Sequence, residues 1–518
     1  MFTLTINEEK FTYAQPVLIS DAIHEIGLPF SMPCGGGHTC GKCKVTARGV
    51  LSEMTDEERR HLSTDEIAAG IRLACFTYAL GDAEILTAEK KQEQILTAGA
   101  MEYFRLDPLA DGYGIAVDIG TTTVVSYLYR PGNREPAQVV SHHNEQARYG
   151  ADVISRIGYC NENGVAAPQE TIVSQLNKSF SALCNAENIS IASVGSAVIT
   201  GNTTMLHLLF GLEPRGIAVA PFTPKSLFGE FVVPSQLGLC LPDTCRLYVP
   251  RSVSSYVGAD ITCAILASGM TEKKENSFLV DIGTNGEMAL FSGGQLKCCS
   301  TAAGPAFEGA GIKMGMSALE GAVNKVWEED GTLKYTTIGE KPAVGICGSG
   351  IIDAVAACVR CGLIDETGLI QEDNACYAGC IDDGDEPAIR IGNSGVLLTQ
   401  ADIRKIQLAK SAIRAGIDTL LHECGISAEA PDTFYIAGGF GSFIDKQSAA
   451  GIGLIPPSAV SHVKVIGNGA GMGAAACLLS KEKLTESEQI AAAAAEVELS
   501  GNPYFMDCYI DRMMFETE

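Results

Sequence analysis

Four cysteines near the start of the chain have a spacing that could bind a metal centre. They are Cys34, Cys40, Cys43 and Cys75, and glycines occupy most of the gap between the first two. Three thiolates can reach one centre only where the backbone wraps tightly around it, which glycine permits because it adopts positive φ freely. A plant-type [2Fe–2S] site has one residue fewer in this first gap. The pattern therefore favours an iron–sulfur cluster and the transfer of single electrons.

The same cysteines could instead form a four-cysteine zinc site. Such sites usually contain two Cys-x2-Cys pairs, whereas only Cys40 and Cys43 form one in this segment. His38 lies in the glycine-rich loop and is expected to pack there, because a Rieske-type centre needs two histidine ligands. The cluster is therefore the favoured prediction, with zinc as its alternative.

A second group of cysteines lies further along the chain. On spacing alone, Cys358, Cys361, Cys376 and Cys380 could hold zinc or another cluster. However, the first two fall within an apolar run at residues 351–363 that has a helical pattern, where small buried thiols are common. We therefore expect buried thiols there, and a second metal site stays an alternative.

Two copies of the sequence Asp-Ile-Gly-Thr indicate phosphate chemistry. One copy begins at Asp118 and the other at Asp281, and each lies between two apolar segments with the pattern of strands. Backbone N–H groups at the glycine and the threonine hydroxyls can donate to phosphate oxygens. The two aspartates could orient a hydrated Mg²⁺, and Glu287 could position the attacking water, with an exposed strand carboxylate as its alternative. The expected phosphate-binding residues are Gly120, Thr121, Thr122, Gly283, Thr284, Asn285 and Gly286.

A glycine-rich turn is expected to contribute to the same site. It contains Gly438, Gly439 and Gly441 and follows an apolar strand at residues 433–437. Bare backbone there could lie flat against an adenine or a ribose, whereas a tight turn between a strand and a helix is the alternative. The chain has no Gly-x4-Gly-Lys-Ser/Thr sequence, which excludes a Walker-type site.

The elements that must position these residues fall into three parts. Residues 1–88 contain short strands, a helix and the cysteine loop in an order that resembles a β-grasp ferredoxin, an α+β fold. Residues 89–111 lack clear periodicity and are expected to be a linker. Residues 112–518 alternate strands with long helices, which is an α/β pattern. Because the Asp-Ile-Gly-Thr hairpin is repeated there, we expect two duplicated subdomains, at about 112–276 and 277–518, that face a cleft.

The composition limits the kinds of partner and the cellular compartment that we expect for the protein. The chain has 518 residues and a net charge of −25, which argues against nucleic acid because its phosphates need basic partners. It opens with a polar, strand-like segment rather than an export signal, and no apolar stretch is long enough for a membrane span. Its 19 cysteines then fit a reducing cytoplasm better than a disulfide scaffold. The last element, at residues 505–514, is expected to be a closing strand.

The phosphate loops and the glycine turn together resemble the ASKHA superfamily of actin, sugar kinases and Hsp70-type ATPases. Residues 118–122 are similar to the first phosphate loop of that superfamily, 281–286 to the second and 437–441 to its adenosine motif. With a ferredoxin ahead of such a domain, the chain resembles the reductive activators of corrinoid proteins over nearly its whole length. Further similarity lies in residues 150–157, 200–205, 303–309 and 348–353.

This resemblance implies an ATP-dependent enzyme that returns inactive Co(II) corrinoid to Co(I). It implies a [2Fe–2S] cluster on the four N-terminal cysteines, ATP and Mg²⁺ in the cleft, a corrinoid protein of a methyltransferase system as partner, and a separate upstream electron donor. Better-known members have an additional middle domain between the ferredoxin and the ATPase, whereas here only residues 89–111 separate the two. Any dimerisation or docking that this domain provides is therefore in doubt, and a homodimer is one of the oligomeric states left open.

Three other functions are compatible with parts of the pattern. A redox-gated small-molecule kinase would share the ATPase fold, but it needs a phosphoryl-acceptor site with a catalytic base that the sequence does not indicate. An activator of another radical metalloenzyme, such as a dehydratase, resembles a family that holds its cluster between two subunits and has no fused ferredoxin. A nucleotide-gated redox sensor would bind a partner without catalysis. ATP turnover that a corrinoid protein stimulates would separate the predicted function from these.

Overall fold

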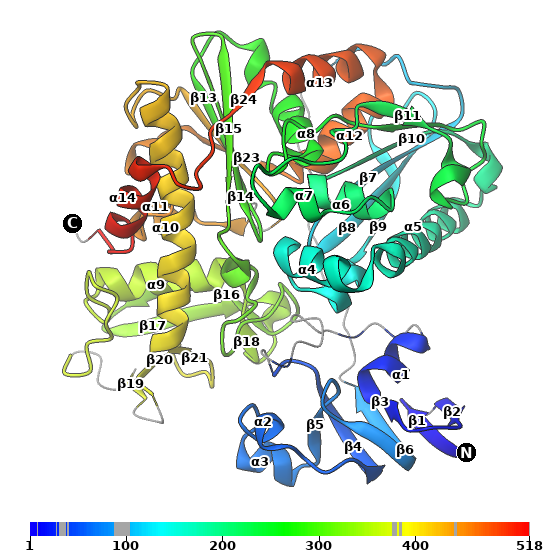
Figure 1. The fold of residues 1–518 in the computed structure, drawn as a ribbon. Coiled ribbons are helices and arrows are strands. Elements are labelled where there is room, and N and C mark those ends of the chain that lie inside the picture. The colour runs from blue at the N-terminus through cyan, green and yellow to red at the C-terminus, as the bar shows by residue number, and fades with distance from the viewer. Residues whose placement is uncertain are drawn as a thin grey trace. The chain divides into compact units, whose positions relative to one another are not determined.

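The computed structural model describes residues 1–7, 9–26, 28, 30, 38, 41–87, 104–374, 381–382, 386–439 and 443–516. Five residues discussed above, Cys34, Cys40, Cys376, Cys380 and Gly441, lie outside these ranges. Contacts between residues divide the chain into two units (Figure 1), one of Met1–Glu93 with Glu145–Tyr159 and one of Gln94–Asn144 with Cys160–Glu518.

The smaller unit contains a mixed sheet in the order β2-β1-β6-β4-β5, with β3 paired to β6. Strand β1 runs parallel to β6, whereas β4 runs antiparallel to it. Leu4, Ile6 and Val45 belong to a core that Ile19 and Ile23 of helix α1 also enter, which is the β-grasp arrangement that the sequence predicted. Its elements are β1 (Phe2–Ile6), β2 (Glu9–Tyr13), β3 (Val17–Leu18), α1 (Ile19–Glu25), β4 (Lys44–Leu51), α2 (Asp56–Arg59), α3 (Thr64–Ala68), β5 (Ile71–Leu73) and β6 (Tyr78–Thr87).

The larger unit contains two six-stranded sheets whose central strands have the same order and directions. In the first sheet, the order is β11-β12-β10-β7-β8-β9, and in the second it is β23-β22-β13-β14-β15-β24. The hairpin β7–β8 pairs with parallel strand β10, just as the hairpin β13–β14 pairs with parallel strand β22. The predicted duplication is therefore confirmed at the level of strand order and direction.

The strands of the first sheet are β7 (Tyr113–Ile119), β8 (Thr123–Tyr129), β9 (Pro136–His143), β10 (Val194–Gly201), β11 (Glu230–Val232) and β12 (Arg246–Val249). Those of the second are β13 (Ser277–Ile282), β14 (Gly286–Ser292), β15 (Gln295–Thr301), β22 (Thr433–Ala437), β23 (Val463–Gly467) and β24 (Ala494–Glu496). Two three-stranded sheets are formed by β16 (Ala322–Glu329), β17 (Thr332–Thr337) and β18 (Gly345–Ile346), and by β19 (Ile381–Asp382), β20 (Ala388–Arg390) and β21 (Leu397–Thr399).

Helices that pack on these sheets include α8 and α12, which contact each other and β7 or β10 (Figure 1). The helices that follow β7 along the chain are α4 (Val153–Asn163), α5 (Ala166–Glu187), α6 (Thr203–Leu209), α7 (Arg215–Ala218), α8 (Ala259–Ser268), α9 (Gly348–Arg360), α10 (Gln400–Glu423), α11 (Lys446–Gly451), α12 (Gly469–Leu479), α13 (Lys481–Ala493) and α14 (Pro503–Asp511), with a short 3₁₀ helix, η5, at Pro305–Glu308. In the part of the chain that the structure describes, none of these helices has both the length and the apolar character of a membrane span.

Glycines let α12 approach its neighbours closely. A Cβ on Gly473 would lie 2.0 Å from the carbonyl oxygen of Cys263 in α8, so no larger residue fits there. At the other end of α12, a Cβ on Gly114 of β7 would lie 2.9 Å from the side chain of Leu478. Helix α12 therefore lies along β7, and its first turn lies near the end of that strand, where Asp118 is.

The C-terminal element is a helix, so the predicted closing strand at residues 505–514 is wrong. Helix α14 begins after Asn502, whose side chain accepts a hydrogen bond from the N–H of Phe505. Pro503 occupies the first helical position, where its missing N–H costs nothing. The helix packs on α10, where the hydroxyl of Ser411 donates to the carbonyl of Tyr509.

Candidate functional site

Two of the four predicted cluster ligands lie side by side in the smaller unit. The Sγ atoms of Cys43 and Cys75 are 3.2 Å apart, and both side chains are buried. The N–H of Ala74 donates to the carbonyl of Cys43, which ties the two cysteine segments together. Both thiols therefore point at one place, as ligands of a single metal centre must.

His38 packs beside Cys75 through its ring. Its ring stacks on Phe76, with ring centroids 4.0 Å apart. One ring nitrogen lies 2.9 Å from the carbonyl oxygen of Cys75. These contacts agree with the predicted packing role within the loop.

A buried ion pair holds the segment that carries Cys75. Two nitrogens of the Arg72 guanidinium donate to the two carboxylate oxygens of Glu58 at 2.9 Å each. The same carboxylate accepts the N–H of Leu73 and the hydroxyl of Thr77. Glu58 is fully buried, so these bonds replace its lost hydration and fix the backbone on both sides of Cys75.

The two Asp-Ile-Gly-Thr segments form turns at the tips of two equivalent hairpins. The N–H of Gly120 donates to the carbonyl of Thr123 at 2.9 Å, and the N–H of Gly283 donates to that of Asn285 at 3.0 Å. A Cβ on Gly120 would lie 2.7 Å from the Thr123 oxygen, so the first turn requires glycine. The hairpins therefore place both turns at the carboxyl ends of β7 and β13.

Threonine hydroxyls from the two turns meet. The Oγ1 atoms of Thr122 and Thr284 are 3.0 Å apart. Each hydroxyl also donates to Glu308 in η5, at 2.9 Å from Thr122 and 3.0 Å from Thr284. The neighbouring Thr121 has a different partner, because its hydroxyl accepts a hydrogen bond from the side chain of Asn202, the N-cap of α6.

Carboxylates gather around these turns and raise one another's pKa. Burial, with the negative charges of Asp260 and Asp281, raises the pKa of Asp118 to about 8. Burial, with Asp260 and Glu308, raises the pKa of Asp281 to about 7, and burial raises the pKa of Asp260 to about 6. Burial, with Asp260 and Asp281, raises the pKa of Glu287 well above its usual range. Acids that repel one another in this way are suited to a cation between them.

The three predicted catalytic carboxylates are therefore brought together, and Glu287 is buried. Its side chain is only 8% exposed, so the alternative of an exposed strand carboxylate is wrong. Its neighbour Asn285 donates a side-chain hydrogen bond that favours the ionised form of Glu287. Gly286 faces the core instead, where a Cβ would lie 2.9 Å from the side chain of Ile413.

Two carboxylates of the site, Asp260 and Glu308, were missing from the predicted set. Asp260 lies in the first turn of α8, two residues after the N-cap Gly258, where a Cβ would strike Asn202 and the Asp260 side chain. Each acid lies within two residues of a glycine, Asp260 in the first turn of α8 and Glu308 at the end of η5, directly before Gly309. Such a pattern is common, however, and only the path of the chain brings these two acids to the loops.

The glycine turn lies against the second phosphate loop. A Cβ on Gly438 would lie 2.7 Å from a carboxylate oxygen of Asp281 and from the carbonyl of Ile282, and its φ is +97°. Among the described residues other than its chain neighbours, no heavy atom lies within 4 Å of the Cβ position of Gly439, and Gly439 is exposed. These two glycines therefore flank the loop, while Gly441 lies outside the described residues.

A divalent cation in this site would be held mainly through water and phosphate oxygens. Among the described residues, no group of three or more His, Cys, Asp or Glu side chains could chelate one metal ion. Mg²⁺ dehydrates reluctantly and usually keeps several waters while it bridges phosphates. The mutually repelling Asp118, Asp260 and Asp281 fit such a hydrated ion.

In the described half of the second cysteine group, Cys358 is buried and Cys361 is half-buried. Cys358 is fully buried in α9 within the core of the second subdomain. The Sγ of Cys361 lies 3.6 Å from the carbonyl of Cys358, which is a helix-internal contact. The predicted packing role agrees with these contacts, while Cys376 and Cys380 lie outside the described residues.

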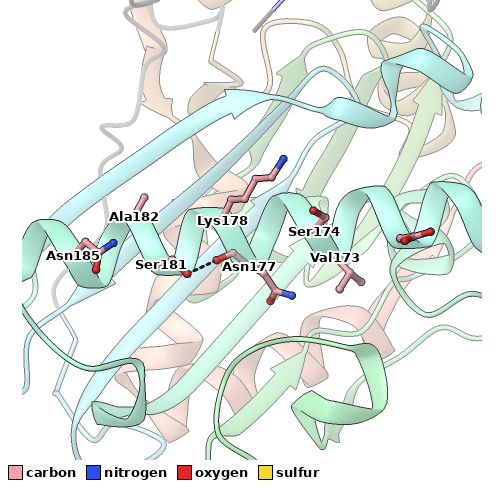
Figure 2. A pocket seen from close by; sticks show the side chains of 8 residues that line it. Val173, Ser174, Asn177, Lys178, Ser181, Ala182 and Asn185 are labelled. Carbon is pink, nitrogen blue, oxygen red and sulfur yellow. Dashed lines mark hydrogen bonds between the residues drawn. The ribbon is translucent and has the colours of Figure 1, made fainter. Parts of the chain in front are cut away.

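A shallow hollow on the outer face of α5 has no relation to the predicted site residues. Figure 2 shows that its lining side chains, among them Asn177, Lys178 and Asn185, come from this one helix. The hydroxyl of Ser181 donates to the backbone carbonyl of Asn177, a bond within the helix. No element faces these side chains from the opposite side of the hollow, so it does not form an enclosed site in the described chain.

Three protein-family models match the sequence and together cover most of it. The "2Fe-2S iron-sulfur cluster binding domain" matches residues 4–80, the "RACo middle region" residues 113–273, and the "C-terminal domain of RACo the ASKHA domain" residues 275–518. The first and third matches confirm the predicted ferredoxin and ASKHA folds, and the first supports an iron–sulfur cluster over zinc. The middle-region match falls on the first predicted ATPase subdomain, so the expectation that the chain lacks a middle domain is wrong.

Proteins of known role are similar to the chain over most of its length. The corrinoid activation enzyme RamQ of Eubacterium limosum is 32% identical, with 98% of each chain covered. The [Co(II) methylated amine-specific corrinoid protein] reductase of Methanosarcina barkeri is 27% identical over 73% of this chain and 72% of its own. A solved structure of a reductive activator for corrinoid,iron-sulfur protein matches with a TM-score of 0.72 and 29% identity, covering 99% of this chain and 98% of its own.

Proposed function

The chain belongs to the family of reductive activators of corrinoid proteins, and we propose that it uses ATP to drive single electrons from a [2Fe–2S] cluster to a corrinoid protein. The electron would reduce Co(II) to Co(I) on that partner. The observation that carries the ATP step is the meeting of Thr122 and Thr284, one hydroxyl from each duplicated turn. Two donors from opposite halves at one point are suited to a phosphate between those halves.

The electron-carrying part of the proposal rests on the cysteine loop. Cys34, Cys40, Cys43 and Cys75 would hold the cluster, which supplies one electron at a time when bound. Glu58 would keep Cys75 in register through its bonds to Arg72 and Leu73. The buried core on one side of the cysteine pair keeps water from those two thiols.

The nucleotide part rests on the two turns and their acids. Backbone at Gly120 and Gly283 would approach the phosphates, and Asp118 with Asp281 would orient a hydrated Mg²⁺ through its waters. Glu287 would position the attacking water, since it is buried beside Asp260 and Asp281. The bare turn at Gly438 and Gly439 would lie against the adenosine, as the predicted motif requires.

ATP is needed because the electron transfer is expected to be uphill. A plant-type cluster has a potential of about −400 mV, and the Co(II)/Co(I) couple is expected to lie lower. For one electron, every ~59 mV of difference costs a factor of ten in the equilibrium constant. Nucleotide binding can offset this only if it favours a conformation in which the acceptor is easier to reduce. Closure of the two halves around the nucleotide would be that change.

The remaining parts of the proposal concern the setting of the protein. We expect the corrinoid partner to belong to a methyltransferase system and a separate reductant to reload the cluster. We also expect a cytoplasmic location, because the 19 cysteines of the sequence fit a reducing compartment better than a disulfide scaffold. A homodimer is one oligomeric state that light scattering of the purified chain would test.

An anaerobic reduction assay tests the function. The reduced chain is mixed with a corrinoid protein in the Co(II) state, with and without MgATP, and Co(I) is followed by its absorbance. We expect Co(I) to accumulate only with MgATP, and ATP turnover to rise when the corrinoid protein is present. An equal yield of Co(I) in both samples would contradict the proposed role of ATP.

A further inference from the structure

We propose that Glu308 determines the specificity of the nucleotide site, because its carboxylate competes with a nucleotide phosphate for the hydroxyls of Thr122 and Thr284. The inference rests on the proposed function, since it assumes that these hydroxyls serve phosphate. It assigns a role to a residue outside the predicted catalytic set. A ligand with a phosphate that reaches this point must displace Glu308, whereas one without such a phosphate need not.

Three side chains form a closed ring that contains four oxygen atoms. Thr122 Oγ1 and Thr284 Oγ1 lie 3.0 Å apart, Thr122 lies 2.9 Å from one carboxylate oxygen of Glu308, and Thr284 lies 3.0 Å from the other. The carboxylate therefore spans both hydroxyls, as the oxygens of a phosphate group would. The ring also joins the two duplicated halves, because each threonine comes from a different one.

Counting hydrogens shows why the carboxylate and a phosphate exclude each other. A threonine hydroxyl has one hydrogen, so a hydroxyl that donates to Glu308 has none left for a phosphate oxygen. A phosphate at this place would also bring a second negative charge against the carboxylate in a buried site. Glu308 must therefore release both threonines before they can serve a phosphate.

Glu308 lies in a short turn rather than in a long helix or a strand. Glu308 ends a single turn of 3₁₀ helix that lies between Gly304 and Gly309, whose φ angles are +77° and +79°. The N–H of Gly304 donates to the carbonyl of Thr284, so this segment and the second phosphate loop are directly connected. Burial raises the pKa of Glu308 although both threonine bonds lower it, so its ionised form depends on keeping those bonds.

Binding measurements on Glu308→Ala test the competition. We expect this variant to bind AMPPNP with Mg²⁺ about tenfold more tightly than the native chain, which corresponds to 1.4 kcal/mol, and to bind adenosine unchanged. Glu308→Gln keeps the shape, and its amide can donate to one threonine and accept from the other, so the ring should persist and the gain should be smaller. Glu329→Ala, at an exposed position of β16, should change neither affinity.

Hydrogen exchange without nucleotide provides a second readout. In Glu308→Ala, amides of residues 120–123 and 283–286 should exchange faster than in the native chain, because the ring no longer ties the turns together. Unchanged exchange, or an equal gain in affinity for AMPPNP and adenosine, would overturn the inference. If the native chain bound no nucleotide at all, the proposed function would fail, but faster exchange in Glu308→Ala would still show that the ring holds the turns.

Discussion

The hydroxyl oxygens of Thr122 and Thr284 lie 3.0 Å apart although 162 positions separate these residues in the chain. They do not occupy matching places in the duplicated motif. Thr284 is the threonine of the second Asp-Ile-Gly-Thr copy, whereas Thr122 is the residue after the threonine of the first copy. The matching residue in the first copy, Thr121, is instead bonded to Asn202. The two halves are therefore duplicated in fold but use different threonines at the point where they meet.

Removing one hydroxyl of this pair should weaken nucleotide binding. Thr284→Val keeps the shape of the side chain and loses its donor, so we expect AMPPNP with Mg²⁺ to bind about tenfold more weakly. Because Thr122 shares the same partners, the double variant with Thr122→Val should lose less than the product of the two single effects. Isothermal titration calorimetry measures all three. Thr332→Val, at an exposed position of β17, is the control, and full additivity would contradict a shared contact.

The charge of Asp118 should make stability depend on pH. Its pKa is raised from 3.8 to about 8 in the folded chain, so between these values the folded state keeps a proton that the unfolded chain has lost. The free energy of unfolding should therefore fall as pH rises through this window in the absence of Mg²⁺. Asp118→Asn should make the fall shallower. Urea unfolding followed by the fluorescence of Trp327, the single tryptophan, measures it in the unit that contains Asp118.

Two further samples complete the pH experiment. Asp330→Asn changes an exposed turn residue with a φ of +49°, which asparagine tolerates, and it should leave the slope unchanged. Saturating MgATP should flatten the slope of the native chain, because a cation near Asp118 and Asp281 favours their ionised forms. A slope in Asp118→Asn as steep as in the native chain would contradict the predicted proton.

The sequence predicted those parts of the site whose geometry is local. An apolar strand followed by Asp-x-Gly-Thr encodes a hairpin turn by itself, so Asp118 and Asp281 could be found without the fold. Asp260 and Glu308 could not, because their approach depends on how α8 and η5 pack on the sheets. The apolar residues of 505–514 favoured a strand, and that prediction was wrong. The residues just before them indicate a helix, because Asn502 followed by Pro503 is a typical helix start.

The buried carboxylate of Glu58 should be essential for the cluster domain. Glu58→Gln removes the charge that pairs with the largely buried Arg72, and loss of one partner of a buried pair typically costs about 3–5 kcal/mol. We expect the variant to lose its cluster at a lower urea concentration than the native chain. Visible absorbance of the anaerobic full-length protein follows this loss. Glu57→Gln, at the exposed neighbouring position, should retain the cluster as the native chain does, and equal retention in Glu58→Gln would contradict the role.

Lys410 should give stability a pH dependence of the opposite sign. Its side chain is 1% exposed on α10, donates to the carbonyl of Met514 and lies 5.0 Å from the ring centre of Phe515. Burial lowers its pKa from 10.5 to about 7, although Glu516 favours the charged form. Between these pH values the unfolded chain binds a proton that the folded chain has released, so the free energy of unfolding should rise with pH.

Lys410→Met should remove this rise, because methionine fills a similar volume and binds no proton. Unfolding in urea at about pH 7.5, 8.5 and 9.5, followed by Trp327 fluorescence, gives the slope over the window that the lysine pKa sets. Lys446→Met, at an exposed position of α11, should keep the slope of the native chain. Parallel curves for Lys410→Met and the native chain would contradict a neutral buried lysine. A free energy of unfolding that stays constant with pH in Lys410→Met would assign the rise to Lys410, which contacts Met514 and Phe515 near the C-terminus.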